Sequence, residues 1–433
     1  MPFDPSLLWY ALPLVGILAY YLSRRGYRER QAQMAREAAM EAGLDQPTSL
    51  HPKIDPLKCI GCGACVAACP EGDVLGRIGG KAVLISAAEC IGHGACRTAC
   101  PVDAIQLVFG TEKRGVDLPH VGPDFQTNIG GIYIAGELGG MGLIRNAIEQ
   151  GRQAMEEIAK RPHRARSDYD VIIVGAGPTG ISASLAAQLA GLRYLTLEQE
   201  SFGGTVAHFP RNKLVMTQPA VLPGYGPVKF NEIHKEALLE FWSEVIADSR
   251  VQISYGERVE RIDWNGEAFS VVTPEGAATT ASVLLAIGRR GTPRRLEVPG
   301  EDLPHVVYRL IDPVQYAGQD VLVVGGGDSA LEAAASLAEE TDAGIILAYR
   351  GKALGRAKPK NRARVDAATA SGRMRLLLST NVAHIEPTQV TLESNGQHRV
   401  FRNDAVIVCA GGVLPTEFLK SIGVEITTKF GTA

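Results

Sequence analysis

The spacing of hydrophobic residues along the chain predicts two kinds of element. One apolar run without charges, residues 7–22, predicts a long helix near the N-terminus. Elsewhere an apolar strand ends in a glycine-rich turn and continues into an Ala- and Leu-rich helix, once at residues 169–192 and again at 320–340. A further strand follows each helix, so these segments predict two Rossmann-like, three-layer α/β domains.

The first 30 residues predict a membrane anchor. The 16 residues of the run would form a helix about 24 Å long, at the short end of what spans a bilayer. In a signal peptide, positive charge precedes the apolar run. Here the positive charge follows the run, as Arg24, Arg25, Arg28 and Arg30. We expect a single-pass transmembrane helix in the cell inner (cytoplasmic) membrane, with the catalytic domains in the cytoplasm. A buried or partner-binding helix is the alternative.

Composition places the remainder among globular proteins. With 433 residues the chain can form several domains, and a net charge of −3 gives no reason to expect nucleic acid as a partner. Seven of the eight cysteines lie between Cys59 and Cys100, which indicates metal binding and not a disulfide framework. The eighth, Cys409, lies in an apolar strand and is expected to be a core residue.

Two stretches of the cysteine-rich region are near copies of each other. Residues 59–70 read CIGCGACVAACP and residues 90–101 read CIGHGACRTACP. This is the spacing of bacterial ferredoxins, and residues 51–110 resemble a two-cluster ferredoxin, a small α+β domain, over their whole length. The resemblance implies a [4Fe-4S] cluster on Cys59, Cys62, Cys65 and Cys100, and a second cluster on Cys69, Cys90 and Cys96 with His93 in the fourth place.

His93 stands where the first copy has Cys62, and three interpretations remain open. The imidazole can ligate a [4Fe-4S] cluster and raise its reduction potential, as histidine does in Rieske centres. Alternatively, the second site holds a [3Fe-4S] cluster, or it holds none, although three retained cysteines argue against the last. We expect the His93 site to have the higher potential.

The first glycine-rich turn has the features of an FAD site. Glycines allow the backbone to approach a pyrophosphate at a helix N-terminus, and the acidic residue after the next strand can accept a ribose hydroxyl. The predicted FAD-binding residues of this region are Gly175, Gly177, Pro178, Gly180, Glu198, Gly203, Gly204, Thr205 and Gly288.

The second turn favours NADPH. The strand after it ends in Tyr349 and Arg350 with no acidic residue, and arginine suits a 2′-phosphate. A solvated basic surface is the alternative interpretation of these cations. The predicted NAD(P)H-binding residues are Gly325, Gly327, Asp328, Ser329, Ala330, Arg350, Lys352 and Arg356.

These motifs in this order resemble the thioredoxin-reductase-like flavoproteins, in which an FAD domain is interrupted by an NAD(P)H domain. The matching stretches are VGAGPTG, LEQESFGGT, LLAIGRRGTPRRLEVPGE, VVGGGDSALEAA and VIVCAGGVLPTEFL. In that family a redox cysteine pair precedes the second turn, and here the same stretch, VVYRLIDPVQYAGQD, has no cysteine.

The order of the pieces also departs from that family. TNIGGIYIAGE, at residues 127–137, resembles the family's C-terminal flavin-binding pattern but precedes the first glycine turn. We interpret residues 125–160 as the last strand and helix of the FAD domain, moved forward by a circular permutation. An unrelated strand–helix pair is the alternative. This resemblance adds Gly136, Glu137 and Met141 to the flavin site, with Glu137 where the family has aspartate.

Together these features predict an oxidoreductase that passes electrons between NAD(P)H, FAD, two clusters and a redox partner protein or membrane carrier. A disulfide reductase and an iron–sulfur redox sensor with little turnover are the alternatives, and a homodimer is possible. No general base or nucleophile is expected. The expected segments are an anchor (1–30), a stalk (31–50), a ferredoxin-like domain (51–110), a permuted strand and helix (111–166), an FAD domain (167–290), an NAD(P)H domain (291–404) and a return into the FAD domain (405–433).

Overall fold

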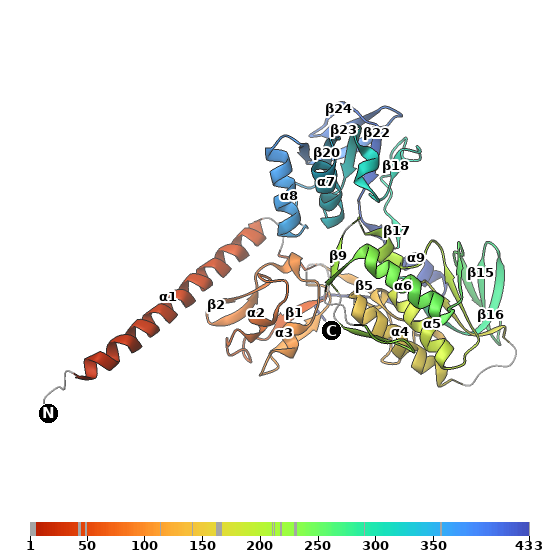
Figure 1. Cartoon of the computed structure of the whole chain (residues 1–433), viewed down its shortest axis with the longest axis horizontal. Helices are drawn as coiled ribbons and strands as arrows, with labels where there is room; N and C mark the ends of the chain where they lie inside the picture. The colour runs from red at the N-terminus through yellow and green to blue at the C-terminus, as the bar shows by residue number, and fades with distance from the viewer. Residues whose placement is uncertain are drawn as a thin grey trace. The chain divides into compact units, whose positions relative to one another are not determined.

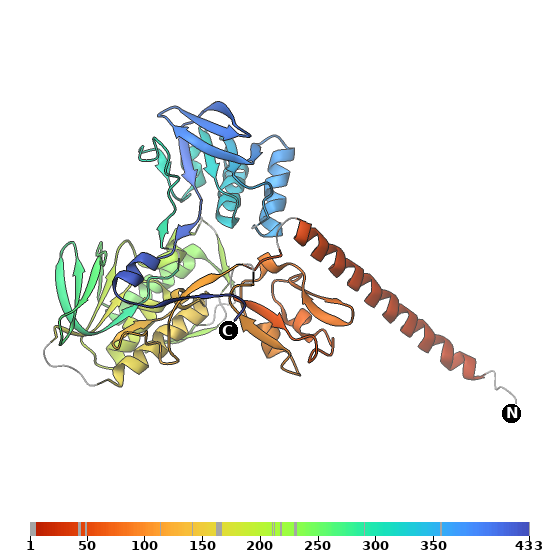
Figure 2. The same ribbon diagram turned by 180° about the vertical axis from the view of Figure 1, so that it is seen from behind.

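The structure is a computed structural model, and its chain forms two compact units: residues 1–116 with 429–433, and residues 117–428 (Figures 1 and 2). The last five residues therefore belong to the same unit as the N-terminus. The structure describes all residues except 1–5, 42–44, 48–49, 113, 141, 162–166, 210, 212, 217–218, 229–231, 290, 356 and 433. It also leaves the side chains of residues 6–11, 214, 216, 232, 292 and 359 undescribed.

Two small antiparallel sheets form the centre of the first unit. β1 (His51–Ile54) pairs with β4 (Ile105–Val108), and β2 (Leu75–Ile78) forms a hairpin with β3 (Lys81–Leu84). Each cysteine-rich loop leads into a short helix, α2 (Ala64–Ala68) or α3 (Ala95–Thr98), after a glycine in the left-handed region. A 3-10 turn, η1 (Ala87–Glu89), precedes the second loop. The repeated sequence therefore folds as a repeated loop and helix.

α1 (Ser6–Glu41) is a single helix whose second half packs on the first unit. Ala32 and Ala39 are buried, and a Cβ placed on Gly76 of β2 would lie 2.8 Å from the Cβ of Ala32. The Glu29 carboxylate accepts a hydrogen bond from the backbone N–H of Gly79 in the β2–β3 hairpin. The helix therefore continues into the expected stalk, residues 31–50, as far as Glu41.

No helix in the described part of the chain is long and apolar enough to cross a membrane. The apolar run of α1 covers only residues 7–22, and Arg24 and Arg25 follow. A membrane span needs about 20 apolar residues, so the predicted transmembrane helix is not supported. The first residues of the apolar run, 7–11, lie outside the described side chains.

The second unit contains two α/β layers of the predicted class. The first layer is built on a seven-stranded sheet. Its strand order is β13-β8-β7-β16-β15-β14, and β6 also pairs with β16. β13, β8, β7, β16 and β6 run parallel, and β15 and β14 complete an antiparallel meander. The strands are β6 (Ile132–Ile134), β7 (Tyr169–Val174), β8 (Tyr194–Glu198), β13 (Ile253–Tyr255), β14 (Arg261–Trp264), β15 (Phe269–Thr273) and β16 (Gly276–Leu285).

Two helices of this layer lie side by side, α4 (Ile144–Ala159) and α5 (Pro178–Leu189) (Figure 1). They approach closely at Gly151, where a Cβ would lie 2.2 Å from the carbonyl oxygen of Thr179. β6 and α4 precede the first glycine turn in sequence but belong to its sheet and its helix layer. This is the arrangement that the permutation hypothesis requires.

The second layer is a parallel sheet in the order β18-β25-β19-β20-β21. Because β25 pairs with β19, this sheet extends to residue 408, beyond the boundary expected at residue 404. A buried apolar strand does not reveal from its sequence which of two sheets it joins. The strands are β18 (Val306–Val307), β19 (Asp320–Val324), β20 (Gly344–Tyr349), β21 (Met374–Leu378) and β25 (Ala405–Val408).

The second unit also contains α7 (Asp328–Glu340), after the second glycine turn, and α8 (Pro359–Ala370). β22 (Thr380–Ile385), β23 (Gln389–Ser394) and β24 (Gln397–Arg402) form an antiparallel sheet. The remaining elements are α6 (Lys235–Ser249), α9 (Thr416–Ser421), β5 (Val116–Pro119), β9 (Leu214–Met216), β10 (Ala220–Leu222), β11 (Gly226–Val228), β12 (Glu232–His234), β17 (Thr292–Pro293), β26 (Gly412–Val413), β27 (Ile426–Lys429), η2 (Glu137–Gly139), η3 (Gly204–His208) and η4 (Pro313–Tyr316).

Candidate functional site

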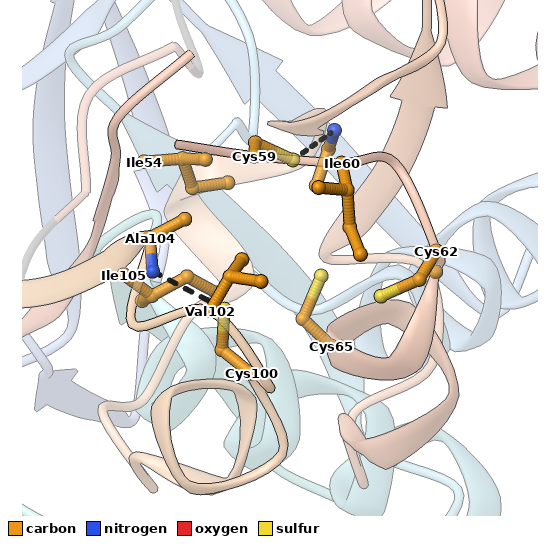
Figure 3. Close-up of a pocket in the computed structure, with 11 residues that line it drawn as sticks. Ile54, Cys59, Ile60, Cys62, Cys65, Cys100, Val102, Ala104 and Ile105 are labelled. Atoms are coloured by element: carbon orange, nitrogen blue, oxygen red, sulfur yellow. Dashed lines mark hydrogen bonds between the residues drawn. The ribbon is translucent and has the colours of Figure 1, made fainter. Parts of the chain in front are cut away.

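Four cysteines of the first unit surround one pocket: Cys59, Cys62, Cys65 and Cys100. Figure 3 shows their side chains around a common space, which Ile54, Ile60, Val102, Ala104 and Ile105 also line. Cys59 and Cys65 are buried, whereas Cys62 is exposed. These are the four residues to which the ferredoxin resemblance assigned one cluster, so the fold brings that set together.

Backbone N–H groups point at two of the four sulfur atoms. Ala82 N donates to Cys59 Sγ at 3.5 Å, and Ala104 N donates to Cys100 Sγ at 3.3 Å. Such hydrogen bonds stabilise a thiolate and are among the factors that set cluster potentials. A pocket with four sulfur atoms, apolar walls and N–H···S contacts therefore fits a [4Fe-4S] cluster.

The β2–β3 hairpin contributes two cations to the first cysteine-rich loop. Lys81 Nζ donates to the carbonyl oxygen of Cys59 at 2.6 Å, and Arg77 Nη1 donates to that of Gly61 at 3.4 Å. Gly61 has a φ of 68°, and a Cβ there would lie 1.8 Å from the carbonyl oxygen of Gly80. Only glycine fits this approach of loop to hairpin. Sequence analysis did not identify Arg77 or Lys81, and the only signal for them was the Gly79-Gly80 turn between them.

The second site collects Cys69, Cys90 and Cys96. Burial raises the pKa of all three thiols, and the charges of Cys69 and Cys90 also raise the pKa of Cys96. All three cysteines pack in one core cluster, which they share with Cys59, Cys65 and Cys100 of the first site. Iron ligation requires thiolates, so cluster binding at such buried thiols is coupled to proton release.

His93 lies beside a carboxylate. Its Nε2 is 3.5 Å from Oε1 of Glu71, and its side chain is only 11% exposed. Metal-ligating histidines commonly direct their second ring nitrogen toward a carboxylate, which fixes the ring orientation. The Glu71 carboxylate also raises the pKa of the Cys69 and Cys90 thiols, after burial and together with other contributions. Glu71 is therefore a residue of the second site that sequence analysis missed.

No group of three or more His, Cys, Asp or Glu side chains within the described ranges is positioned to hold a single metal ion.

In the second unit, the predicted FAD residues meet at the carboxyl ends of parallel strands. Gly175 follows β7 with a φ of 107°, and a Cβ there would lie 2.7 Å from the carbonyl oxygen of Ala286, just after β16. Glu198 ends β8, and its carboxylate accepts hydrogen bonds from Ala176 N at 2.7 Å and Glu200 N at 3.0 Å. A ligand is expected at this edge of an open α/β sheet.

The turn after β7 provides an anion site of the expected kind. Gly177 caps α5 without a side-chain hydrogen bond, and Pro178 occupies its first turn. The first N–H groups of the helix therefore have no side-chain cap and can meet a pyrophosphate. A Cβ at Gly204 would lie 3.0 Å from Gly177 Cα, and a Cβ at Gly288 would lie 4.0 Å from Thr205 Oγ1. These contacts bring η3 and the end of β16 to the same turn, while Gly180 and Gly203 are buried nearby.

The permuted segment reaches the same edge. Gly136 follows β6, and a Cβ there would lie 2.2 Å from Thr179 Oγ1 of α5. Its backbone N–H donates to Gln150 Oε1 of α4 at 2.8 Å. Glu137 is exposed at this position, and Met141 lies outside the described residues. The residues present therefore fit an FAD cradle built from both sides of the permutation.

The second glycine turn is arranged similarly. A Cβ at Gly325 would lie 2.4 Å from the carbonyl oxygen of Cys409, and Gly327 caps α7 without a side-chain hydrogen bond. Ala330 is buried and Ser329 is exposed. These features repeat the anion site of the first turn.

The predicted basic residues next to this turn are exposed where they are described. Arg350 and Lys352 face solvent, and Arg356 lies outside the described residues. Asp328 accepts hydrogen bonds from Lys358 N and Asn361 Nδ2, both at 2.8 Å. Asn361 is buried and holds the basic segment to α7, a role that its sequence position did not reveal.

Comparisons with known proteins agree with this arrangement. A family model described as pyridine nucleotide-disulphide oxidoreductase matches residues 172–431, and one described as a 4Fe-4S dicluster domain matches residues 51–101. A ferredoxin–NADP reductase of Ignicoccus hospitalis is 34% identical over 182 residues, which are 42% of this chain and 56% of the relative. The chain therefore spans little more than half the length of that relative.

Two further relatives are covered more fully. The bacilliredoxin reductase Bdr of Bacillus subtilis is 27% identical over 267 residues, which are 60% of this chain and 82% of that protein. Among solved structures, the bacillithiol disulfide reductase Bdr of Staphylococcus aureus is 27% identical, with a TM-score of 0.53. The match covers 60% of this chain and 81% of the reductase chain.

These findings confirm the predicted dependence on FAD and NAD(P)H and the presence of a 4Fe-4S domain. The family model covers more than half of the chain and both nucleotide turns. The chain belongs to the pyridine nucleotide-disulphide oxidoreductase family, as an FAD- and NAD(P)H-dependent oxidoreductase that also carries a 4Fe-4S dicluster domain.

Proposed function

We propose that this chain transfers electrons between NADPH and a one-electron carrier protein by way of FAD and two iron–sulfur clusters. The observation that carries the proposal is the pocket of four cysteines in a chain that also has two dinucleotide turns. Bound FAD would supply the exchange between a two-electron hydride and single electrons. The chain would hold these groups with Gly175, Glu198 and Gly136 at FAD and with Arg350 and Lys352 near the 2′-phosphate.

The cysteine distribution supports single electrons over dithiol chemistry. Outside residues 59–100 the chain has one cysteine, Cys409. The second unit therefore has no cysteine pair through which electrons could reach a disulfide substrate. The first cluster would be held by Cys59, Cys62, Cys65 and Cys100, and the second by Cys69, Cys90 and Cys96 with His93.

An anaerobic experiment tests this proposal directly. NADPH is added to the full chain with its cofactors in place, and low-temperature EPR spectra are recorded. A reduced-cluster signal is expected, because the flavin would connect nicotinamide to iron. Bleaching of the flavin without a cluster signal would show that the clusters lie too low in potential for NADPH and instead supply electrons to the flavin. Failure to bleach the flavin would refute NADPH as the donor.

A second candidate function is reduction of a small-molecule or protein disulfide. The observation that favours it is the likeness to the bacilliredoxin and bacillithiol disulfide reductases. The matched part of this chain covers 82% of the first and 81% of the second. In that case the substrate would have to bring its own thiols. Anaerobic NADPH oxidation with bacillithiol disulfide, compared with oxidation driven by an acidic ferredoxin, separates the two functions.

Location at the cytoplasmic side of the inner membrane is a separate proposal. It rests on the arginines that follow the apolar run of α1, since positive charge is retained on that side. Fractionation of cells that express the full chain tests it, and recovery of the chain wholly apart from the membrane fraction would refute it.

A further inference from the structure

An exposed apolar rim surrounds the pocket of the first cluster site. Ile60 and Val102 line this pocket, yet they are 63% and 37% exposed. Leu57, two residues before Cys59, is 93% exposed, and Cys62 is itself exposed. In Figure 3, Ile60 and Val102 lie among the four cysteines. Large exposed apolar side chains grouped at one site mark an interaction surface.

The charges around this rim are mainly positive. The segments 53–65 and 100–104 carry Lys53, Asp55, Lys58 and Asp103, and the hairpin adds Arg77 and Lys81 through its hydrogen bonds to the loop. Four cations against two carboxylates leave a formal balance of +2. Lys53 and Lys58 are exposed and form no ion pair with any described residue. Their charge is therefore available to a partner.

The second cluster site has the opposite charge. Its segments, 69–73 and 89–97, carry Glu71, Asp73, Glu89 and Arg97, a formal balance of −2. None of its three cysteines is exposed, and the His93 side chain is nearly covered. An acidic partner would be attracted to the first site and repelled from the second, since opposed surface potentials steer encounter and register.

We infer that an acidic one-electron carrier protein docks on the first-cluster face, defined by Leu57, Ile60, Cys62, Val102 and Lys58, and exchanges electrons with the chain there. Lys53 on the adjoining strand β1 adds to the positive charge near this face without lining the pocket. This inference rests on the proposed function and names its partner class and its docking site. Each NADPH gives up two electrons, which two carrier molecules accept one at a time, with release of NADP⁺ and one proton. The carrier's negative charge selects this face, and the apolar rim excludes water from the contact.

The test reverses the two free charges. The K53E/K58E variant of the full chain is assayed with NADPH and two probes at low ionic strength: a purified acidic ferredoxin, and cytochrome c as a basic carrier. We expect kcat/KM for the ferredoxin to fall at least about tenfold and its salt dependence to weaken, while kcat/KM for cytochrome c rises. The L57S variant should raise KM for the ferredoxin without changing its salt dependence.

Two controls make the result specific. R375E/R399E changes two exposed arginines of the second unit by the same total charge and should leave both rates unchanged. Reduction of menadione, a small neutral acceptor, should be unchanged in every variant, and FAD and iron contents report correct folding.

Unaltered ferredoxin kinetics in K53E/K58E, or an equal effect in R375E/R399E, would overturn the docking site. The proposed function fails in a different experiment. If NADPH produces no cluster EPR signal in the unmodified chain, the electron path itself is refuted, whatever the lysine variants do.

Discussion

The first cysteine-rich loop, residues 59–70, and the second, residues 90–101, differ more in their surroundings than in their sequence. Lys81 and Arg77 hold the carbonyl groups of the first loop, and Cys62 is exposed beside an apolar rim. In the second loop His93 replaces that exposed cysteine and lies 3.5 Å from the Glu71 carboxylate. The loops differ at three positions, and the exchange of Cys62 for His93 coincides with a change from a cationic, open site to an anionic, covered one.

This difference shows that a ligand motif alone does not order the two cluster potentials. Ligation by His93 in place of a thiolate would raise the potential of the second cluster, whereas the carboxylates around that site would lower it. The cations and the solvent exposure of the first site would raise the potential of the first cluster. The expectation that the His93 site has the higher potential therefore depends on ligation outweighing the surrounding charge. The predictions that follow test each side of this balance.

Removing one ligand from each site should have the largest effect. In C65S the first pocket loses a buried sulfur ligand, so we expect the iron content to fall by about half and electron transfer from NADPH to an acidic ferredoxin to stop. The matched variant C96S should also lose about half of its iron but keep the first-cluster signal. Iron analysis and EPR of both variants check this. Identical residual spectra in the two variants would contradict two separate sites.

The glycines that follow the first ligand of each loop should differ in their tolerance of a methyl group. A Cβ at Gly61 would lie 1.8 Å from the carbonyl oxygen of Gly80, and one at Gly92 would lie 2.9 Å from that of Leu50. Both have positive φ, so we expect G61A to lower the free energy of unfolding by roughly 3 kcal/mol or more, and G92A by about half as much. Urea unfolding of the cluster-loaded chain measures both. A larger loss in G92A would show that the hairpin contact does not restrict the first loop.

Restoring the missing cysteine tests ligation at the second site. H93C should shift the potential of the second cluster to more negative values by on the order of 100 mV, because a thiolate replaces a neutral ligand. The first cluster should be unaffected and provides the internal control. Redox titration followed by EPR measures both potentials. Conversion of a three-iron signal into a four-iron signal would instead support the [3Fe-4S] alternative, and no change at either cluster would exclude His93 as a ligand.

Neutralising one charge at each site should produce smaller shifts of opposite sign. E71Q removes a negative charge beside His93 and should raise the potential of the second cluster. K81Q removes a positive charge from the first loop and should lower the potential of the first cluster. The same titration compares them, and each shift should be smaller than that of H93C. Shifts of the same sign would refute the charge asymmetry between the sites.

Local sequence patterns predicted much of this protein. Strand, glycine turn and helix in register predicted both α/β layers, because the turn and the apolar period are properties of neighbouring residues. The ferredoxin resemblance grouped Cys100 with Cys59, Cys62 and Cys65, and the structure brings these four to one pocket. The flavin resemblance of residues 125–160 likewise agreed with the pairing of β6 and β16.

Tertiary structure decided what depends on contacts between distant segments. The partner of β25 could not be read from its sequence, since a buried strand is apolar in either sheet. The hydrogen bonds of Arg77 and Lys81 to the first loop, and the position of Glu71 beside His93, follow from how the hairpin and loops fold against one another. Sequence by itself determined the presence and spacing of residue types that suit iron and nucleotides, because those are chemical and local properties. Only the fold decided the charge and exposure of each cluster site, because these are sums over neighbours that are brought together by long-range packing.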